Sequence, residues 1–277
     1  MQKIPLAVAV VVILQTTVMA TWSVIAVDRK TGQIVIASAT CVAQQAFAGF
    51  PAKGLKDVQA IIIPGKGIAA AQANVDRTRK LQNLIAAELN KHTDPARIID
   101  MLKSEDQAHA SRQYGIVDLE GRFAGYSGAS NGKQSLDRQS RVDGTEIYFS
   151  IQGNILAGDD VIEEAVKAFK QARGSLSDRV MAAMEAADSR GGDRRCNCNT
   201  PPDPPAPCDN KTAHVAYIVV ANKSDKMGEG LNDGHYYLEI QVTDQDIKPD
   251  ENDNPVKTLR MRYDGWMNAH AGQRLKK

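Results

Sequence analysis

The sequence has few aromatic residues and no excess of charge of either sign. Phe, Trp and Tyr make up 5% of its 277 residues, and 34 basic side chains stand against 33 acidic ones. Proteins that bind nucleic acid usually carry a basic surface, often with aromatic residues that stack on bases. No long basic run suggests contact with a membrane surface either. We therefore expect no nucleic-acid partner.

Long hydrophobic runs are also missing. The most apolar segment, Ile4 to Leu14, is about eleven residues long, well short of the roughly 20 that a membrane-spanning helix needs. It follows Lys3 and precedes the small residues Val18 and Ala20, which is the pattern of a cleaved export signal. We predict that residues 1–20 are removed, which makes the mature chain secreted or periplasmic and leaves it without a membrane anchor.

Cleavage after Ala20 makes Thr21 the first residue of the mature chain. The α-amine of a terminal threonine, with a reference pKa of about 7.7–8.0, can take the proton from its own Oγ when that oxygen attacks a carbonyl group. Thr21 also begins a nearly continuous apolar stretch that ends at Asp28, as in a strand buried on both faces. Thr21 is therefore our candidate nucleophile. The alternative is an ordinary strand residue that happens to follow the cleavage site.

Blocks of predicted strands alternate with predicted helices along the rest of the chain, which indicates stacked sheets covered by helices rather than single βαβ units. We predict one domain over residues 21–277. The predicted strands are 21–28, 33–40, 58–63, 68–73, 113–118, 122–127, 146–151, 214–221 and 236–242, and the predicted helices are 75–91, 94–104, 159–172, 176–188 and 255–270.

Residues 190–212 form a loop rich in cysteine and proline. Five prolines lie within positions 201–207, which excludes a helix or a central strand there. The chain has four cysteines, and an even number in an exported protein favours disulfides. Three pairings are possible. We prefer Cys198–Cys208 as a local clip, with Cys41–Cys196 tying the loop to the second strand.

A zinc site is the alternative use of these cysteines. Cys-x-Cys with one distant cysteine lacks the usual spacing of two ligand pairs, and the five histidines show no ligand spacing. We predict neither a metal nor a cofactor.

Five segments, in this order, resemble the motifs of the family catalogued as domain of unknown function 1028. That resemblance covers most of the mature chain and implies the four-layer αββα sandwich of the N-terminal nucleophile (Ntn) hydrolases, an α+β fold. The family's substrate is not established. The segments are Thr21 to Asp28, Ala71 to Asn74, Arg112 to Asp118, Phe149 to Asn154 and Gly191 to Arg195.

The resemblance also implies roles for single residues. Thr21 matches the leading threonine of the family. Asn74 and Asn154 each follow a predicted strand and are candidate donors to a developing oxyanion, with backbone capping or turn formation as the alternative. The second strand ends Ala39-Thr40-Cys41, so it lacks the lysine that proteasome-type relatives carry there.

Asp28, Asp193 and Arg194 are the candidate residues for orienting the amine or binding a substrate carboxylate. For Gly191-Gly192-Asp193 the alternative is a helix C-cap followed by an Asx turn.

Two functions follow from these observations. The first is an exported Ntn-type hydrolase that cleaves a small-molecule or peptide amide through Thr21. The second is a non-catalytic exported binding or scaffold protein with the same fold, and a homodimer is left open in both cases. If the first is right, Thr21 should lie at one end of the sandwich with its Oγ reachable from a cleft. Asn74 or Asn154 should then lie close to it.

Overall fold

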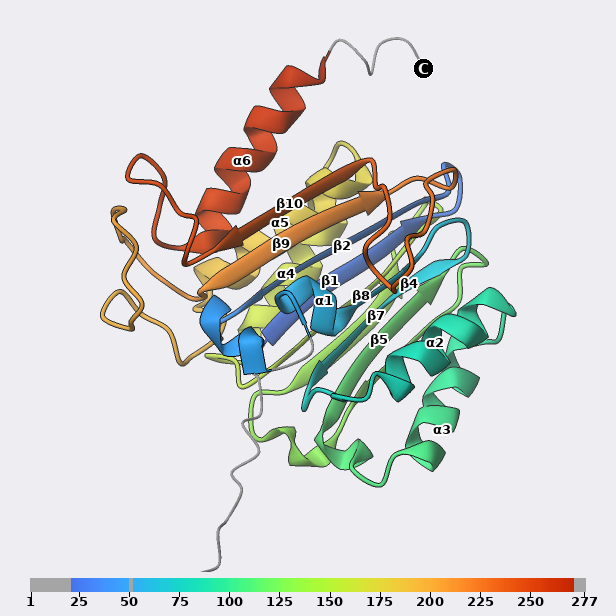
Figure 1. The fold of residues 1–277 in the computed structure, drawn as a ribbon. Helices are drawn as coiled ribbons and strands as arrows, with labels where there is room; N and C mark the ends of the chain where they lie inside the picture. The colour runs from blue at the N-terminus through green and yellow to red at the C-terminus, as the bar shows by residue number, and fades with distance from the viewer. Residues whose placement is uncertain (1–20, 50–51, 272–277) are drawn as a thin grey trace, which may run out of the picture.

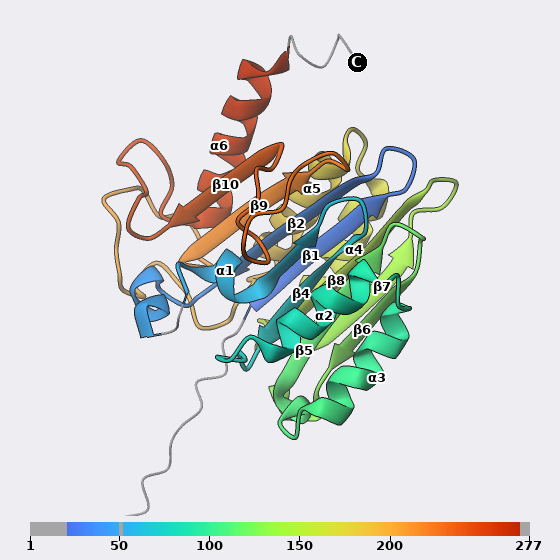
Figure 2. The same cartoon turned by 45° about the vertical axis from the view of Figure 1, so that its right-hand side comes forward.

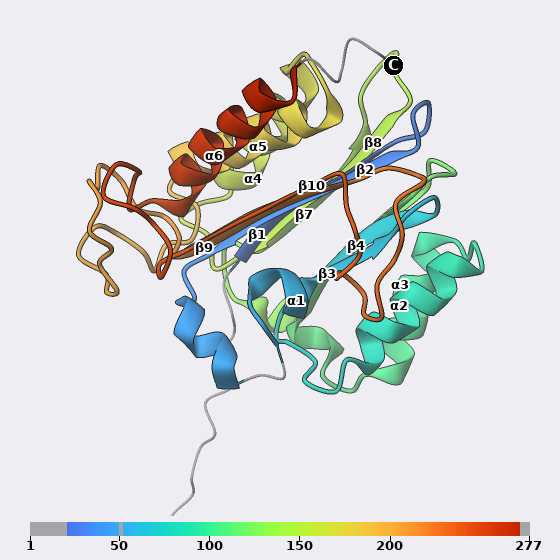
Figure 3. The same ribbon diagram turned by 45° about the horizontal axis from the view of Figure 1, so that its top comes forward.

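The computed structural model describes residues 21–49 and 52–271, so the predicted signal segment 1–20 lies outside the described residues. Two antiparallel sheets face each other, and helices cover the outer face of each sheet (Figures 1 and 3). The protein is thus the four-layer αββα sandwich that the resemblance implied.

The larger sheet has six strands in the order β10-β9-β2-β1-β8-β7, with β1 near its centre. Helices α4, α5 and α6 cover its outer face (Figure 3). The strands are β1 (Thr21–Asp28), β2 (Gln33–Thr40), β7 (Leu136–Arg141), β8 (Ile147–Asn154), β9 (Val215–Ala221) and β10 (Leu238–Thr243), and the helices are α4 (Asp160–Gln171), α5 (Leu176–Ser189) and α6 (Pro255–Ala269).

The smaller sheet has four strands in the order β3-β4-β5-β6, and helices α2 and α3 lie on its outer face (Figure 2). Short helices lie in the connections: η1 and α1 between β2 and β3, η2 between α3 and β5, and η3 between β6 and β7. The strands are β3 (Ala60–Ile63), β4 (Gly67–Ala73), β5 (Arg112–Asp118) and β6 (Phe123–Ser127), and the helices are α1 (Leu55–Gln59), α2 (Lys80–Asn90), α3 (Pro95–Glu105), η1 (Gln44–Gly49), η2 (His109–Ser111) and η3 (Ala129–Asn131).

Strand β1 is apolar nearly throughout because both of its faces are buried. Alternate side chains of a strand point to opposite faces. Trp22 and Val24 accordingly pack toward α4 and α5, while Ile25 and Val27 pack toward the smaller sheet. The sequence therefore specifies a central strand between two cores, as predicted.

Three elements differ from the sequence prediction. The helix predicted over 75–91 begins only at Lys80, because the Asp76 carboxylate accepts from the backbone N–H groups of Thr78 and Leu81, each at 2.9 Å, in a turn ahead of the helix. The strand predicted from Val58 begins at Ala60, since α1 takes the preceding residues. Strand β7 was not predicted.

Across residues 21–49 and 52–271, no helix combines the length and the apolar character needed to cross a membrane.

Candidate active site

Thr21 begins β1 between the last residues of two neighbouring strands. Its register partners are Thr40 of β2 and Asn154 of β8. The Thr21 backbone N donates to Asn154 Oδ1 at 3.2 Å, and Thr21 Oγ1 donates to Thr40 Oγ1 at 3.3 Å. The structure therefore brings Asn154, one of the two predicted asparagines, into direct contact with Thr21.

Access to Thr21 differs from our expectation. In the uncut chain Thr21 is 1% exposed, and its register partners Thr40 and Asn154 are buried as well. The expected opening of Oγ onto a cleft is not seen in this state of the chain.

Gln72 of β4 links the smaller sheet to the backbone of Thr21. Its Nε2 donates to the Thr21 carbonyl oxygen at 3.0 Å and to Gln113 Oε1 at 2.8 Å. Its Oε1 accepts from Ser23 Oγ and Gln59 Nε2, both at 2.7 Å. A carboxamide offers two donors and two acceptor sites, and Gln72 uses all four. Sequence reasoning missed this role, although a glutamine inside the apolar stretch 68–73 was a usable signal.

Gln72 belongs to a group of buried polar residues in the layer between the sheets, which we call the polar half. Toward the other end of β1 this layer contains aliphatic residues, among them Ile25, Ile36, Ile62 and Ile68, which we call the apolar half. The polar half comprises Ser23, Gln59, Gln72, Gln113 and Gln152, each at most 4% exposed.

Gly115 of β5 permits the close approach of the two sheets beside the polar half. A Cβ at this position would lie 2.6 Å from Ser150 Oγ and 2.8 Å from Gln152 Oε1. Both atoms belong to β8, so any side chain at position 115 would push β5 away from the strand that carries Asn154.

The chain turns sharply directly after Asn154. Ile155 has a φ of 53°, and a β-branched residue in this left-handed region is a genuine outlier. Such strain persists only where the surroundings hold it, and it concentrates at functional sites. Here the Ile155 carbonyl accepts from Arg194 N at 3.4 Å, and Leu156 pairs with Asp193 in an isolated bridge. The strained corner fixes the position of Asn154 beside Thr21.

Asp193 is completely buried near this corner. It accepts from the backbone N of Cys41 at 2.9 Å and from the backbone N and the guanidinium of Arg195. The Arg195 contact is the Asx turn that we considered as the alternative, and the N–H groups of Gly191 and Gly192 close the C-terminal end of α5. These contacts give Asp193 a structural role next to Thr40.

Gly192 also makes room for the residue after Thr21. A Cβ at position 192, where φ is +44°, would lie 2.6 Å from the ring of Trp22. The motif after α5 and the motif at the start of β1 are therefore in direct contact.

The remaining predicted site residues lie elsewhere or make other contacts. Arg194 donates to Gln134 Oε1 at 3.4 Å. Asn74 directly follows β4 of the smaller sheet, and its amide donates to Ser111 Oγ at 3.1 Å.

Asp28 lies at the opposite end of β1 from Thr21, about 23 Å away at the usual rise of a strand. It accepts from Lys30 N and Thr31 Oγ1 in the β1–β2 turn. A cleft of about 400 Å³ opens at this end, lined in part by Lys66 and His92. Asp28 is therefore too far from Thr21 to share a small substrate with it.

Both predicted disulfides are present. Cys41 pairs with Cys196 and Cys198 pairs with Cys208. Cys41 directly follows Thr40, so the first disulfide fastens the 190–212 loop beside the partner of Thr21. The second closes the proline-rich part of the loop.

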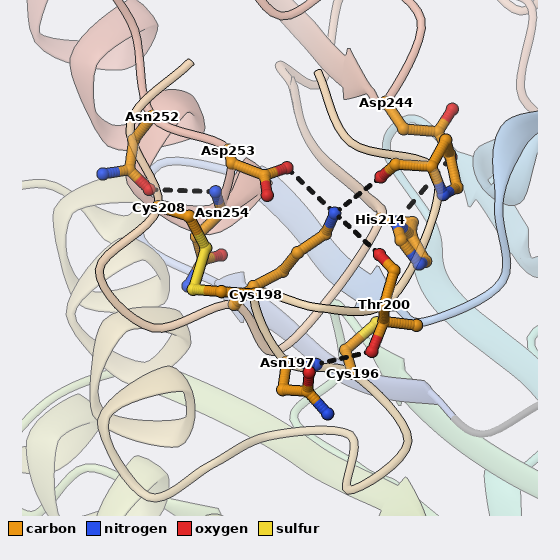
Figure 4. Close-up of polar contacts among 12 residues, drawn as sticks. Cys196, Asn197, Cys198, Thr200, Cys208, His214, Asp244, Asn252, Asp253 and Asn254 are labelled. Carbon is orange, nitrogen blue, oxygen red and sulfur yellow. Dashed lines mark hydrogen bonds and ion pairs between the residues drawn. A yellow bond between two sulfur atoms is a disulfide. The ribbon is translucent and has the colours of Figure 1, made fainter. Parts of the chain in front are cut away.

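A buried lysine holds the same loop from inside. The Lys211 ammonium lies 2.9 Å from Asp253 Oδ1 and donates to the carbonyl oxygens of Thr200 and Pro202. Asp253 and Thr200, two of these partners, are labelled in Figure 4. Nearby, burial and, to a smaller extent, the positive charges of Lys211 and Arg195 together lower the pKa of His214 to about 4, so this imidazole is neutral at pH 7. The loop is thus anchored by two disulfides and one buried ion pair.

The architecture is a four-layer αββα sandwich, the fold that the resemblance implied. The chain belongs to the family of unknown function DUF1028, whose model matches residues 21–200. A crystal structure assigned to this family, from Silicibacter pomeroyi, is 20% identical with a TM-score of 0.62, and the match covers 90% of this chain and 89% of the other. It shows the same fold. No curated protein matches the sequence.

Two other solved structures match the chain more weakly. Eukaryotic HslV from Trypanosoma brucei is 11% identical with a TM-score of 0.37, over 72% of this chain and 99% of its own. The Thiobacillus denitrificans protein BPH, solved in complex with epoxomicin, is 13% identical with a TM-score of 0.31, over 74% and 99%. Likenesses this weak establish nothing further about this chain.

Proposed function

We propose that the protein is an exported amidohydrolase whose nucleophile is Thr21, exposed as the N-terminal residue by cleavage after Ala20. The observation that carries this proposal is the contact between the Thr21 nitrogen and Asn154 Oδ1 at 3.2 Å. After cleavage that nitrogen becomes an α-amine, and a fixed acceptor beside it orients its remaining N–H groups and its lone pair.

The chemistry proceeds in two steps. Thr21 Oγ adds to the carbonyl carbon of the amide, and its proton passes to the α-amine and then to the leaving nitrogen. The C–N bond breaks and an ester on Thr21 remains. Water then cleaves the ester, with the same amine as the base. The second strand ends Ala39-Thr40-Cys41 and has no lysine there, so the α-amine is the only base that this mechanism uses.

The carboxamide of Asn154 serves this mechanism in two ways. Its oxygen orients the amine, and its N–H groups are donors of the kind that stabilise an oxyanion during acyl transfer. Asn74 is the second predicted donor. Asn74 directly follows β4 and donates to Ser111 Oγ. It lies two residues after Gln72, which donates to the Thr21 carbonyl oxygen.

The first test is the mature N-terminus. Sequencing of the exported protein by mass spectrometry should begin at Thr-Trp-Ser-Val. A chain that begins at Trp22 or later, or that stays uncut, would rule out Thr21 as the nucleophile.

The second test is activity against a panel of small-molecule and peptide amides. Thr21→Ala should abolish hydrolysis while changing the free energy of unfolding by only about 1 kcal/mol, the value of a single hydrogen bond. Thr21→Ser keeps the hydroxyl and should retain activity, which makes it the matched control. Equal hydrolysis by wild type and Thr21→Ala would overturn the proposal.

A non-catalytic binding or scaffold protein is the second candidate, and the burial of Thr21 in the uncut chain favours it. Periodate distinguishes the two, because it splits a free N-terminal threonine between Cα and Cβ and changes the mass of the protein. Rapid reaction of the folded mature protein supports the enzyme. Reaction only after unfolding supports the scaffold.

A further inference from the structure

The disulfide between Cys41 and Cys196 has a histidine beside it that the sequence spacing did not reveal. Cys41 follows β2, Cys196 lies in the loop after α5, and His214 directly precedes β9. One nitrogen of His214 and the two sulfur atoms all lie within 4.8 Å of one another. Three segments distant in the sequence thus present two sulfur atoms and one imidazole to a single point.

His214 and its neighbour Asp244 carry buried polar atoms that lack hydrogen bonds. His214 is 2% exposed and Asp244 8%. Within the described part of the chain, neither His214 Nδ1 nor Asp244 Oδ1 has a hydrogen-bond partner. His214 Nδ1 lies 3.9 Å from Asp244 Oδ2, which is too long for a hydrogen bond.

His214 Nδ1 is therefore not hydrogen-bonded to any described residue when the disulfide is closed. A buried polar atom without a partner costs about 1–3 kcal/mol. The backbone N of His214 donates to the Thr40 carbonyl oxygen at 2.7 Å, so the histidine is held in this place by the sheet. Figure 4 shows His214 with Asp244 on one side and Cys196 on the other.

We propose that the reduced form of this cluster is a zinc site, with Cys41 Sγ, Cys196 Sγ and one nitrogen of His214 as its three protein ligands. A dithiol or phosphine reductant supplies two electrons, and with two protons the disulfide becomes two thiols while the reductant is oxidised. Zn²⁺ then displaces both thiol protons. Oxidation and metal binding exclude each other, because the same two sulfur atoms are used in both.

The geometry of the cluster fits this ion. Zinc binds thiolate at about 2.3 Å and nitrogen or oxygen at about 2.0–2.2 Å, in a tetrahedron whose ligands lie about 3.3–3.8 Å apart. The spread of 4.8 Å already present leaves the imidazole within reach.

The charges around the cluster fit as well. Two thiolates, a neutral imidazole and Zn²⁺ sum to zero charge. The cationic groups of Lys211 and Arg195 are near enough to act on His214. A positive field stabilises thiolates, which are the ligand form of cysteine. Asp253 and Asp193 pair with these two cations, so the region stays close to neutral when the metal is bound.

The consequence concerns the loop rather than the chemistry at Thr21. Either the disulfide or the bound zinc would hold the 190–212 loop beside Thr40. The surroundings of Thr21 would then persist under reducing conditions as long as zinc is present.

The test uses two variants of the full chain that keep the same number of cysteines. Cys198→Ser/Cys208→Ser keeps only the proposed pair, and Cys41→Ser/Cys196→Ser keeps only the other pair as the matched control. Each is reduced with a phosphine, given Zn²⁺, freed of excess metal by gel filtration, and analysed for zinc. We expect one zinc per chain in the first variant and none in the control or in the oxidised protein. Equal zinc in the two reduced variants would overturn the proposal.

Two further measurements identify the ligands and do not depend on a correctly folded control. Zn²⁺ should protect both remaining thiols of Cys198→Ser/Cys208→Ser from alkylation and raise its melting temperature. Co²⁺ in place of zinc should give the absorption of a tetrahedral thiolate complex, and His214→Ala should weaken Co²⁺ binding at least tenfold. Unprotected thiols, an unchanged melting temperature or an unaltered Co²⁺ affinity would each contradict the site.

Discussion

The two halves of the layer between the sheets share the same strands but differ in chemistry. In the apolar half, aliphatic residues such as Ile25 and Ile68 interlock without polar partners. In the polar half, Gln72 and Gln113 form a network that reaches the Thr21 carbonyl oxygen and the Gly153 carbonyl oxygen. A sandwich needs only the first kind of packing to be stable.

The difference indicates what the polar half is for. Burying glutamine side chains brings no net gain over aliphatic packing unless every hydrogen bond is made, and partly satisfied networks are costly. The network in this protein is nearly complete around Gln72, but Gln152 Oε1 lacks a partner within the described residues. Directional bonds of this kind fix positions, and the positions that they fix are those of β1 and β8 at Thr21 and Asn154.

The largest effect should come from the apolar half. Ile36→Ala removes a fully buried side chain and should lower the free energy of unfolding by about 3–4 kcal/mol. Because the cavity lies away from Thr21, the reaction of the mature N-terminus with periodate should keep its rate. Urea unfolding and periodate kinetics measure the two quantities. A slower periodate reaction together with an unchanged free energy of unfolding would contradict the prediction, because it would give Ile36 a role at Thr21 rather than in stability.

The second largest effect should be a loss of stability at acidic pH. It concerns His214, whose backbone N donates to the carbonyl oxygen of Thr40 at the end of β2. The pKa of His214 is about 4 in the folded protein, below the ordinary value of 6.5. Between these values the unfolded chain binds a proton that the folded chain does not. Stability is therefore fully present above pH 6.5 and falls toward pH 4, by up to about 3 kcal/mol.

Urea unfolding of the oxidised protein at pH 5 and pH 7 measures this loss, with His214→Gln as the comparison. Burial raises the pKa of Asp244, and this acts in the opposite sense at lower pH. The difference between wild type and variant therefore isolates the histidine. Identical pH profiles for both proteins would contradict the prediction.

A smaller loss of stability, with a larger effect on the site, is expected for Gln72→Met. The substitution leaves the Thr21 carbonyl and Ser23 Oγ without their partner, which should cost about 2 kcal/mol. Amide hydrolysis should slow at least tenfold, since small displacements of a nucleophile are costly to the rate. Gln33→Met is the matched control, because Gln33 bonds Asn222 away from Thr21. Equal activity of the two variants would remove Gln72 from the site.

The smallest effect is expected at the far end of β1. Asp28→Ala loses two turn hydrogen bonds, one to Lys30 and one to Thr31, and should cost about 1 kcal/mol. Hydrolysis should be unchanged, because this carboxylate lies about 23 Å from Thr21. A loss of activity as large as that of Thr21→Ala would restore Asp28 as a substrate-binding residue.

Most of the fold could be predicted because its strands and helices carry strong local patterns. The apolar stretch from Thr21 to Asp28 and the cap formed by Asp94 and Pro95 both appear as expected. Strand β7 could not be predicted, because its sequence Leu-Asp-Arg-Gln-Ser-Arg has no apolar alternation. It is an edge strand, and polar residues are common on edges because they discourage pairing with other chains.

The candidate site was predictable only in part, for a different reason. Asn154 was found because it ends a recognisable motif, and the disulfide partners followed from spacing and compartment. Thr40, Gln72 and His214 were not found. Their roles depend on the register between strands and on the way one sheet lies over the other, and neither is encoded in a local pattern.

The contact between Gly192 and Trp22 limits the routes by which this sequence can evolve. Any residue larger than glycine at position 192 meets the indole ring, and its backbone must also adopt a φ of +44°. A smaller residue at position 22 would leave a void under β1 until position 192 changed as well. Neither single substitution is an easy intermediate, so the two positions are expected to change together or not at all.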